Sequence, residues 1–174
     1  RGRNVDRWHY APERYIVVTN FENTGKTIDE QTLKSKFPKT YKYLLHFKKE
    51  LESRKLYGEI IKNEYDFYTL FQVSKGIFSP YKVVWKEISG EISGSGSLIA
   101  SVVEPYSTKY VKQKIVMPDH KLMYVPVKDK DEAFYLVGML NSSPIKLIVA
   151  GYTIETSIST HILEHIRIPT YDPS

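Results

Sequence analysis

Cysteine is absent from this chain of 174 residues, which excludes disulfide bonds and thiolate metal sites. Long apolar runs are missing as well. The longest uncharged run covers residues 133–145, which is shorter than the roughly 20 residues that a membrane helix needs. We therefore expect no disulfide, no signal peptide and no membrane segment, and we expect the cytoplasm as the compartment.

The sequence also has few of the patterns that mark an active site. The glycines at 90, 94 and 96 are not followed by the Lys and Ser/Thr of a phosphate-binding loop, and they lack the G-x-G-x-x-G spacing of a dinucleotide site. There is no G-x-S-x-G motif. His9, His46 and His120 have no paired base or orienting acid at a recognisable spacing. We expect no catalytic residue in this chain.

Two patterns suggest a metal, but neither is complete. His161, Glu164 and His165 match H-x-x-E-H, in which two histidines one helical turn apart share a metal. That enzyme class needs a third ligand well downstream, and only nine residues follow His165. Asp119 and Lys121 have the acidic-x-Lys spacing of a nuclease site without the earlier Pro-Asp that such a site requires. We expect no bound metal.

Aromatic and basic residues are what the chain does contain. It has 14 Tyr, 7 Phe and 2 Trp, with 25 basic residues against 20 acidic ones. A net charge of +5 fits a nucleic-acid-binding domain and an ordinary basic domain equally well. The length favours one domain over residues 1–174. Because the chain opens at Arg1 without a Met, we expect it to be a piece of a longer protein.

The most regular pattern lies between Met123 and Pro144. Apolar residues alternate up to Val127, which predicts a half-buried strand, and Pro126 favours an edge or end position in the sheet. Asp129 with Glu132 predicts the start of a helix that runs to about residue 140. Asn141 is expected in the left-handed conformation that closes this helix, and Ser143-Pro144 is expected to begin the next one.

The remaining segments predict an α+β fold, in which helices flank a mixed, mainly antiparallel β-sheet. Further strands are predicted at residues 15–19, 81–86, 98–103 and 166–169. Helices are predicted at residues 29–36, 38–55 and 64–72, with Leu33, Phe37, Leu44, Phe47 and Leu51 facing inward. Residues 114–117 and 122–127 are expected to form a hairpin.

Cations stand at two places where they would suit an anionic partner. Arg1, Arg3 and Arg7 precede Trp8, and arginine forks bind phosphates and guanine edges. Trp8 would either stack on a base or seal the edge of the domain. On the predicted helix 38–55, Lys42, His46, Lys49 and Ser53 form one ridge, which could follow a phosphate backbone or simply be solvated.

Taken in order, these segments resemble the TaqI-like C-terminal specificity domain of adenine-specific DNA methyltransferases. Residues 1–8 are similar to the opening of that family, and residues 37–54 to its "P-x-x-Y-x-Y-L … L-x-x-R" helix. Residues 81–85, 136–142 and 166–169 are similar to a core strand, to the helix ending in Leu-Asn-Ser and to the closing strand. Tyr81 replaces a common Pro, and the Gly/Ser-rich residues 89–97 have no family counterpart.

The resemblance implies a DNA target-recognition domain of a restriction–modification enzyme, in the cytoplasm of a prokaryote. In that family an upstream domain with an Asn-Pro-Pro-aromatic motif transfers a methyl group from S-adenosylmethionine to adenine. No Asn-Pro-Pro occurs here, so this piece is expected to be non-catalytic and to hold no cofactor. Residues 1–14 would be the connector from the catalytic domain, which would be a partner within the same chain.

The expected second partner is double-stranded DNA. Phosphate contacts are expected from Arg1, Arg3, Arg7, Lys109, Lys112 and Lys114, and base contacts from Lys75, Ser95, Ser97 and His120. The alternative is a protein-interaction domain, which would dock a partner subunit through aromatic residues and the Gly/Ser-rich segment without touching DNA. A small hydrolase with a metal at His161 and His165 is a third possibility.

Overall fold

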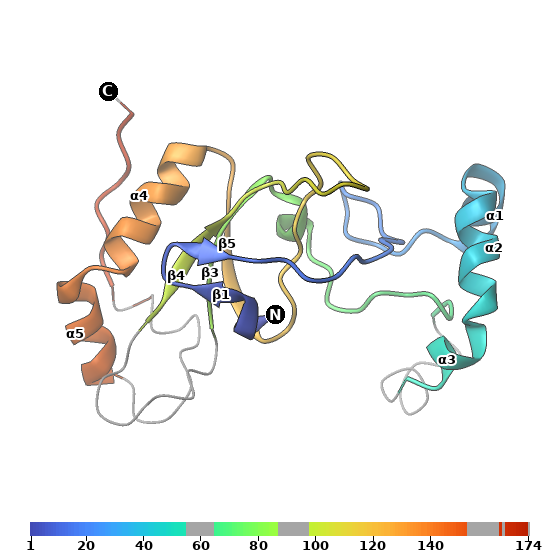
Figure 1. Cartoon of the computed structure of the whole chain (residues 1–174), viewed down its shortest axis with the longest axis horizontal. Helices are drawn as coiled ribbons and strands as arrows, with labels where there is room; N and C mark the ends of the chain where they lie inside the picture. The colour runs from blue at the N-terminus through green and yellow to red at the C-terminus, as the bar shows by residue number, and fades with distance from the viewer. Residues whose placement is uncertain (55–64, 87–97, 153–163, 165, 174) are drawn as a thin grey trace. The chain divides into compact units, whose positions relative to one another are not determined.

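The computed structural model describes residues 1–54, 65–86, 98–152, 164 and 166–173. The chain divides into two compact units. The first, which we call the sheet unit, joins Arg1–Arg14 to Gly76–Ser174, and the second, the helical unit, is Tyr15–Lys75. Figure 1 labels their elements, which combine helices with small antiparallel sheets, so the predicted α+β class is confirmed.

The sheet unit is built on three antiparallel strands in the order β4-β3-β5. The central strand β3 is Tyr81–Lys86, and its neighbours are β4, Ala100–Val103, and β5, Leu122–Val127. The predicted bounds of β3 and β5 are confirmed, and β4 begins two residues later than expected. Within the described sheet β5 is an edge strand, as Pro126 had indicated, because proline cannot donate a ladder hydrogen bond.

The predicted hairpin of residues 114–117 with 122–127 is wrong. Strand β5 pairs with β3 through Val83↔Val125, while Lys114 pairs with Tyr106. Alternating apolar residues predict a strand but do not specify its partner, which depends on packing between distant segments.

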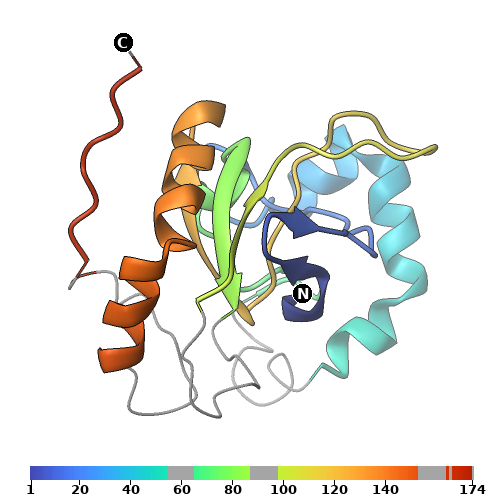
Figure 2. The ribbon, with the colours of Figure 1, turned by 60° about the vertical axis from the view of Figure 1, so that its left-hand side comes forward.

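Helix α4, Lys130–Leu140, covers one face of this sheet, and α5, Ser143–Tyr152, follows it and packs into the same core (Figure 2). The side chains of Val83 and Trp85 face them, because alternate residues of a strand share a face. Val137 of α4 is completely buried in the same cluster. Asp129 caps α4 as predicted, since its carboxylate accepts the Glu132 N–H at 2.9 Å.

The other face of the sheet is covered by the first residues of the chain. A 3₁₀ turn, η1 (Gly2–Asn4), leads into β1 (Val5–Asp6), which pairs antiparallel with β2 (His9–Tyr10). Val5 is buried against Val84 of β3. Residues 1–14 are therefore an integral layer of the sheet unit, and their expected link to a catalytic domain stays a prediction.

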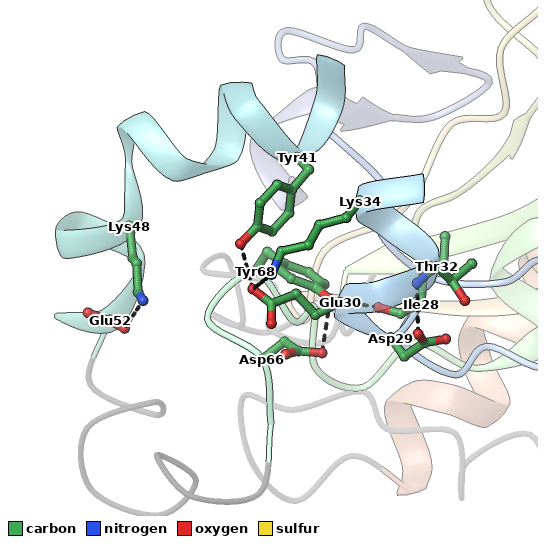
Figure 3. Close-up of polar contacts among 10 residues, drawn as sticks. All are labelled: Ile28, Asp29, Glu30, Thr32, Lys34, Tyr41, Lys48, Glu52, Asp66 and Tyr68. Atoms are coloured by element: carbon green, nitrogen blue, oxygen red, sulfur yellow. Dashed lines mark hydrogen bonds and ion pairs between the residues drawn. The ribbon is translucent and has the colours of Figure 1, made fainter. Parts of the chain in front are cut away.

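In the helical unit, α1 is Glu30–Lys36, α2 is Pro38–His46 and α3 is Lys48–Glu52. The carboxylate of Asp29 caps α1 as predicted, accepting the Thr32 N–H at 2.8 Å. Figure 3 shows this cap together with the contacts of Tyr41 and Tyr68. The small core consists of Ile28, Leu33, Leu44, Phe67 and Tyr68.

Several predictions for the helical unit are wrong. The helix expected over 38–55 is divided at Phe47. The Phe47 N–H bonds to the carbonyls of Leu44 and Leu45, and not to the carbonyl four residues earlier as in a continuous α-helix. Phe37 and Phe47 are 46% and 44% exposed instead of buried. Residues 65–72 are not helical, and residues 15–19 form no strand, with Tyr15 62% exposed. Aromatic and β-branched content predicted regular structure, whereas the available core is too small to bury all these side chains.

Two predictions near the C-terminal end are corrected as well. Asn141 has φ −83°, a right-handed conformation, so it is not the left-handed cap expected from its residue type. Residues 166–169 form no strand, although Ile166 and Ile168 pack against the core of the sheet unit. The Tyr135 hydroxyl donates to the Pro169 carbonyl at 3.0 Å, which fixes this segment beside α4.

Within the described residues, no single helix is both long and apolar enough to cross a membrane. The pair Lys130–Leu140 and Ser143–Gly151 reaches the length only together, and it is bent by 60° at the break.

Candidate nucleic-acid interface

One open hollow of about 390 Å³ brings together residues from the two chain segments that form the sheet unit. Arg1, Gly2 and Arg3 line it from the η1 turn, and Asp119, His120 and Lys121 line it from the turn before β5. Two of the predicted phosphate-binding residues thus lie beside a predicted base-reading residue, His120.

The two turns are held in place by their own backbones and by close packing. The Asn4 N–H bonds to the Arg1 carbonyl at 2.9 Å, and the Leu122 N–H bonds to the Asp119 carbonyl at 3.0 Å. A β-carbon on Gly2 would lie 3.9 Å from the Lys121 carbonyl oxygen, so the two turns are within contact range. Lys121 was noted in the sequence only for its incomplete nuclease spacing with Asp119, and its place beside the arginines depends on this packing.

Cations outnumber anions in the hollow. Arg1, Arg3 and Lys121 are positive at neutral pH, and Asp119 is the negative residue of the lining. Arg3 also forms an exposed ion pair with Glu13 at 2.9 Å, and its hydrogen bond lowers the pKa of the Glu13 carboxyl. A guanidinium has five N–H donors, so Arg3 can hold Glu13 and still donate to a second oxyanion.

The three predicted lysines stand on one loop of the sheet unit. Tyr106 and Lys114 pair across its base, and the Thr108 N–H bonds to the Val111 carbonyl at 2.7 Å. Lys109, Lys112 and Lys114 are all exposed on this loop, which we call the lysine loop, residues 106–114. Such a cluster can neutralise phosphates without reading sequence.

The lysine loop is anchored to β2, which follows directly after Arg7 and Trp8. The rings of Tyr10 and Tyr106 meet edge to face with centroids 6.1 Å apart. The Tyr10 hydroxyl donates to the Glu104 carbonyl at 2.8 Å, and burial is the main cause that raises the pKa of this phenol. The lysine loop is therefore attached to the strand that follows the arginine-rich N-terminal segment, within one folded unit.

Trp8 does not seal the edge of the domain. It is 56% exposed, at the turn between β1 and β2, where it follows the exposed Arg7. Of the two roles that the sequence allows for this residue, the sealing one is excluded by the structure.

The other predicted contact residues lie in the helical unit or outside the described residues. Lys75 is exposed but belongs to the helical unit. Ser95 and Ser97 lie outside the described residues. The ridge of Lys42, His46, Lys49 and Ser53 is exposed on the helical unit, where the Nδ1 atom of His46 lies 2.7 Å from the Lys42 carbonyl oxygen.

The metal hypothesis receives no support from the part of the chain that the structure describes. His161 and His165 lie outside it, and within it no three His, Asp or Glu side chains gather where a metal could bind. An apolar cavity of about 110 Å³ beneath α4 is lined by residues such as Val83, Leu136 and Ile168, and none of its lining residues has a polar side chain to offer a substrate.

Comparison of the chain with family models, with curated proteins and with solved structures found no match. The candidate interface therefore rests on the geometry of the sheet unit.

Proposed function

We propose that this chain is a DNA target-recognition module of an adenine-specific, S-adenosylmethionine-dependent DNA methyltransferase of a prokaryotic restriction–modification system. The module binds duplex DNA and places the target adenine before a catalytic domain elsewhere in the parent protein. It carries out no chemistry itself and works in the cytoplasm. The observation that supports this proposal is the hollow in which Arg1 and Arg3 meet His120 and Lys121.

The hollow and the lysine loop have complementary uses in this proposal. Arg1, Arg3 and the lysines of the loop neutralise phosphates, which supplies affinity and orients the duplex. His120 is exposed on a turn and can offer a ring N–H or a lone pair to a base edge. Cations that bind the backbone, together with a hydrogen-bonding side chain beside Arg1 and Arg3, have the composition that sequence recognition needs.

Titration of a labelled duplex at two salt concentrations tests binding. In a plot of the logarithm of the association constant against the logarithm of the salt concentration, each neutralised phosphate contributes a slope of about −0.9. If about four phosphates are neutralised, the affinity falls roughly 100-fold between about 50 and 200 mM salt. No binding at low salt, or binding indifferent to salt, contradicts the proposal.

A matched pair of double variants locates the contact surface. Replacing Arg1 and Arg3 by Gln reduces the salt slope by about 2. Replacing Lys36 of α1 and Lys39 of α2 by Gln removes the same charge from the helical unit and leaves the slope unchanged. Equal losses in both variants would show that net charge, and not the hollow, determines binding.

Sequence specificity is tested separately by selection from a pool of random duplexes. The wild-type chain enriches a defined motif, and His120→Asn changes the preference at one or more positions of that motif. A pool that stays random after selection restricts the function to non-specific binding.

One observation favours a second candidate, the docking of a partner subunit. Phe134, Leu147 and Ile148 are exposed on α4 and α5, with Leu147 77% exposed. Apolar side chains at such positions are typical of protein contacts. In this case Leu147→Asp abolishes association with the remainder of the parent protein, while DNA is not bound at any salt concentration.

A further inference from the structure

Trp8 has a backbone conformation that its side chain does not favour. Its φ is +68°, in the left-handed region that is unfavourable for bulky residues. It occupies the turn of the β1–β2 hairpin, in which Asp6 pairs with His9. Glycine or asparagine would fit this turn with less strain, so the conformational preference of the turn does not explain why a tryptophan occupies it.

The indole of Trp8 contributes little to the hydrophobic core. It is 56% exposed, whereas Trp85, the other tryptophan, is completely buried in β3. The hairpin that carries Trp8 is nevertheless well anchored, because Val5 is buried and Tyr10 packs against Tyr106. A large flat ring is therefore presented to solvent on a fixed support.

The chain around Trp8 favours a nucleic acid as the occupant of this ring. Arg7 precedes it directly, and Arg1 and Arg3 begin the same segment and line the basic hollow. The lysine loop is attached to the next strand through Tyr106. An exposed aromatic ring that directly follows Arg7, on a segment with two further arginines, suits a base flanked by phosphates, because the cations bind the backbone while the ring stacks on the base.

We infer that Trp8 stacks on a nucleobase of the bound DNA at a step where the regular stacking of the duplex is interrupted. Inside an intact duplex both faces of each base are covered by its neighbours, so an indole gains contact only where a base is missing, unpaired or turned out. The inference rests on the proposed function, since it requires DNA at the cationic surface, and it adds the class of DNA that binds best.

Two duplexes of one sequence, one fully paired and one with a single central abasic site, test this inference on the complete chain. Stacking on aromatic side chains predicts about tenfold tighter binding of the abasic duplex. Tryptophan emission serves as the second measurement. Because Trp85 is buried, quenching that accompanies binding of the abasic duplex reports the exposed Trp8.

Two variants separate stacking from folding. Trp8→Asn accepts the left-handed turn without providing a ring, and it binds both duplexes with the affinity that the wild type has for the paired one. Trp8→Phe keeps a smaller ring and retains part of the preference. Circular dichroism of both variants checks that the fold is unchanged.

The outcomes distinguish failure of this inference from failure of the proposed function. Salt-sensitive binding with equal affinity for the two duplexes, or a preference that Trp8→Asn retains, overturns the inference and leaves the proposed function standing. Absence of DNA binding at low salt overturns both. Quenching of Trp8 emission by the remainder of the parent protein in the absence of DNA assigns the ring to a protein contact and likewise overturns the inference.

Discussion

The side chain of Asn141 pairs with the backbone of Ala100 as a neighbouring strand would. Its amide nitrogen donates to the Ala100 carbonyl at 2.9 Å, and its amide oxygen accepts the Ala100 N–H at 3.0 Å. Ala100 begins β4, an edge strand of the described sheet, and Asn141 closes α4. One buried side chain therefore joins the end of a helix to the edge of the sheet.

Replacing Asn141 by Leu is expected to lower the free energy of unfolding by about 3 kcal/mol, because a buried N–H and a buried carbonyl lose their partners together. Urea denaturation followed by far-UV circular dichroism measures the change. Ser142→Ala, at the half-buried next position, is the control and is expected to change stability by less than about 0.5 kcal/mol. Equal stabilities of Asn141→Leu and wild type would contradict this role of the pair.

Replacing Trp8 by Gly is expected to stabilise the protein by about 1 kcal/mol. Glycine accepts a φ of +68° without steric cost, and the lost indole is mostly exposed. Relief of the strain of a bulky residue in the left-handed region adds about 1–2 kcal/mol to the free energy of unfolding. The greater conformational entropy of glycine in the unfolded chain offsets part of this gain. Thermal unfolding measures it, and a lower midpoint for Trp8→Gly than for wild type would show that the indole supports the fold.

Lys82 is a completely buried cation in the central strand. Its ammonium donates to the Ser79 carbonyl at 2.6 Å, and burial lowers its pKa to about 8. Between this value and the ordinary pKa of 10.5, the unfolded chain binds the proton and the folded chain does not. The contribution of Lys82 to the free energy of unfolding therefore increases as the pH rises through this interval.

Lys82→Met removes this dependence. The stability advantage of Lys82→Met over wild type is expected to be largest below pH 8 and to shrink by at most about 3 kcal/mol towards pH 10.5. Guanidinium denaturation of both proteins across this interval gives the difference at each pH. A difference that stays constant would show that Lys82 keeps its proton in the folded state.

Tyr68→Phe is expected to weaken the helical unit by about 1–2 kcal/mol. The Tyr68 hydroxyl lies 2.9 Å from both the Ile28 carbonyl and the Asp66 carboxylate, and burial is the main cause that raises the pKa of this phenol. Hydrogen exchange should accelerate in α1 and stay unchanged in β3, because all three residues belong to the helical unit. Tyr43→Phe, at a 54% exposed position, is the control. Equal acceleration in β3 would show that the two units unfold together.

Glu13→Gln is expected to tighten DNA binding about threefold at low salt, since it releases Arg3 from an exposed ion pair of modest strength. Glu22→Gln changes the net charge equally in the helical unit and should leave the affinity unchanged. Titration of both variants with the same duplex measures the effect. Equal gains in the two variants would assign it to net charge alone.

Local patterns in the sequence were enough to predict a large part of the sheet unit. Alternating apolar residues predicted β5, helical spacing predicted α4, and residues 81–86 were recognised as a strand with the bounds of β3. Asp29 and Asp129 were recognisable as caps because a cap bonds to an N–H only three residues away. These features depend on residues that are close together in the chain, so the sequence determines them by itself.

Contacts between distant segments decided the rest. The pairing of β5 with β3, the bond of Asn141 to Ala100, and the exposure of Phe47 all depend on which surfaces remain for packing once the elements form. For the candidate site, residue type alone identified Arg1, Arg3 and His120 as candidates. Only the tertiary structure showed that they share a hollow with Lys121 and that Trp8 faces outward, because burial and proximity arise from the folded packing.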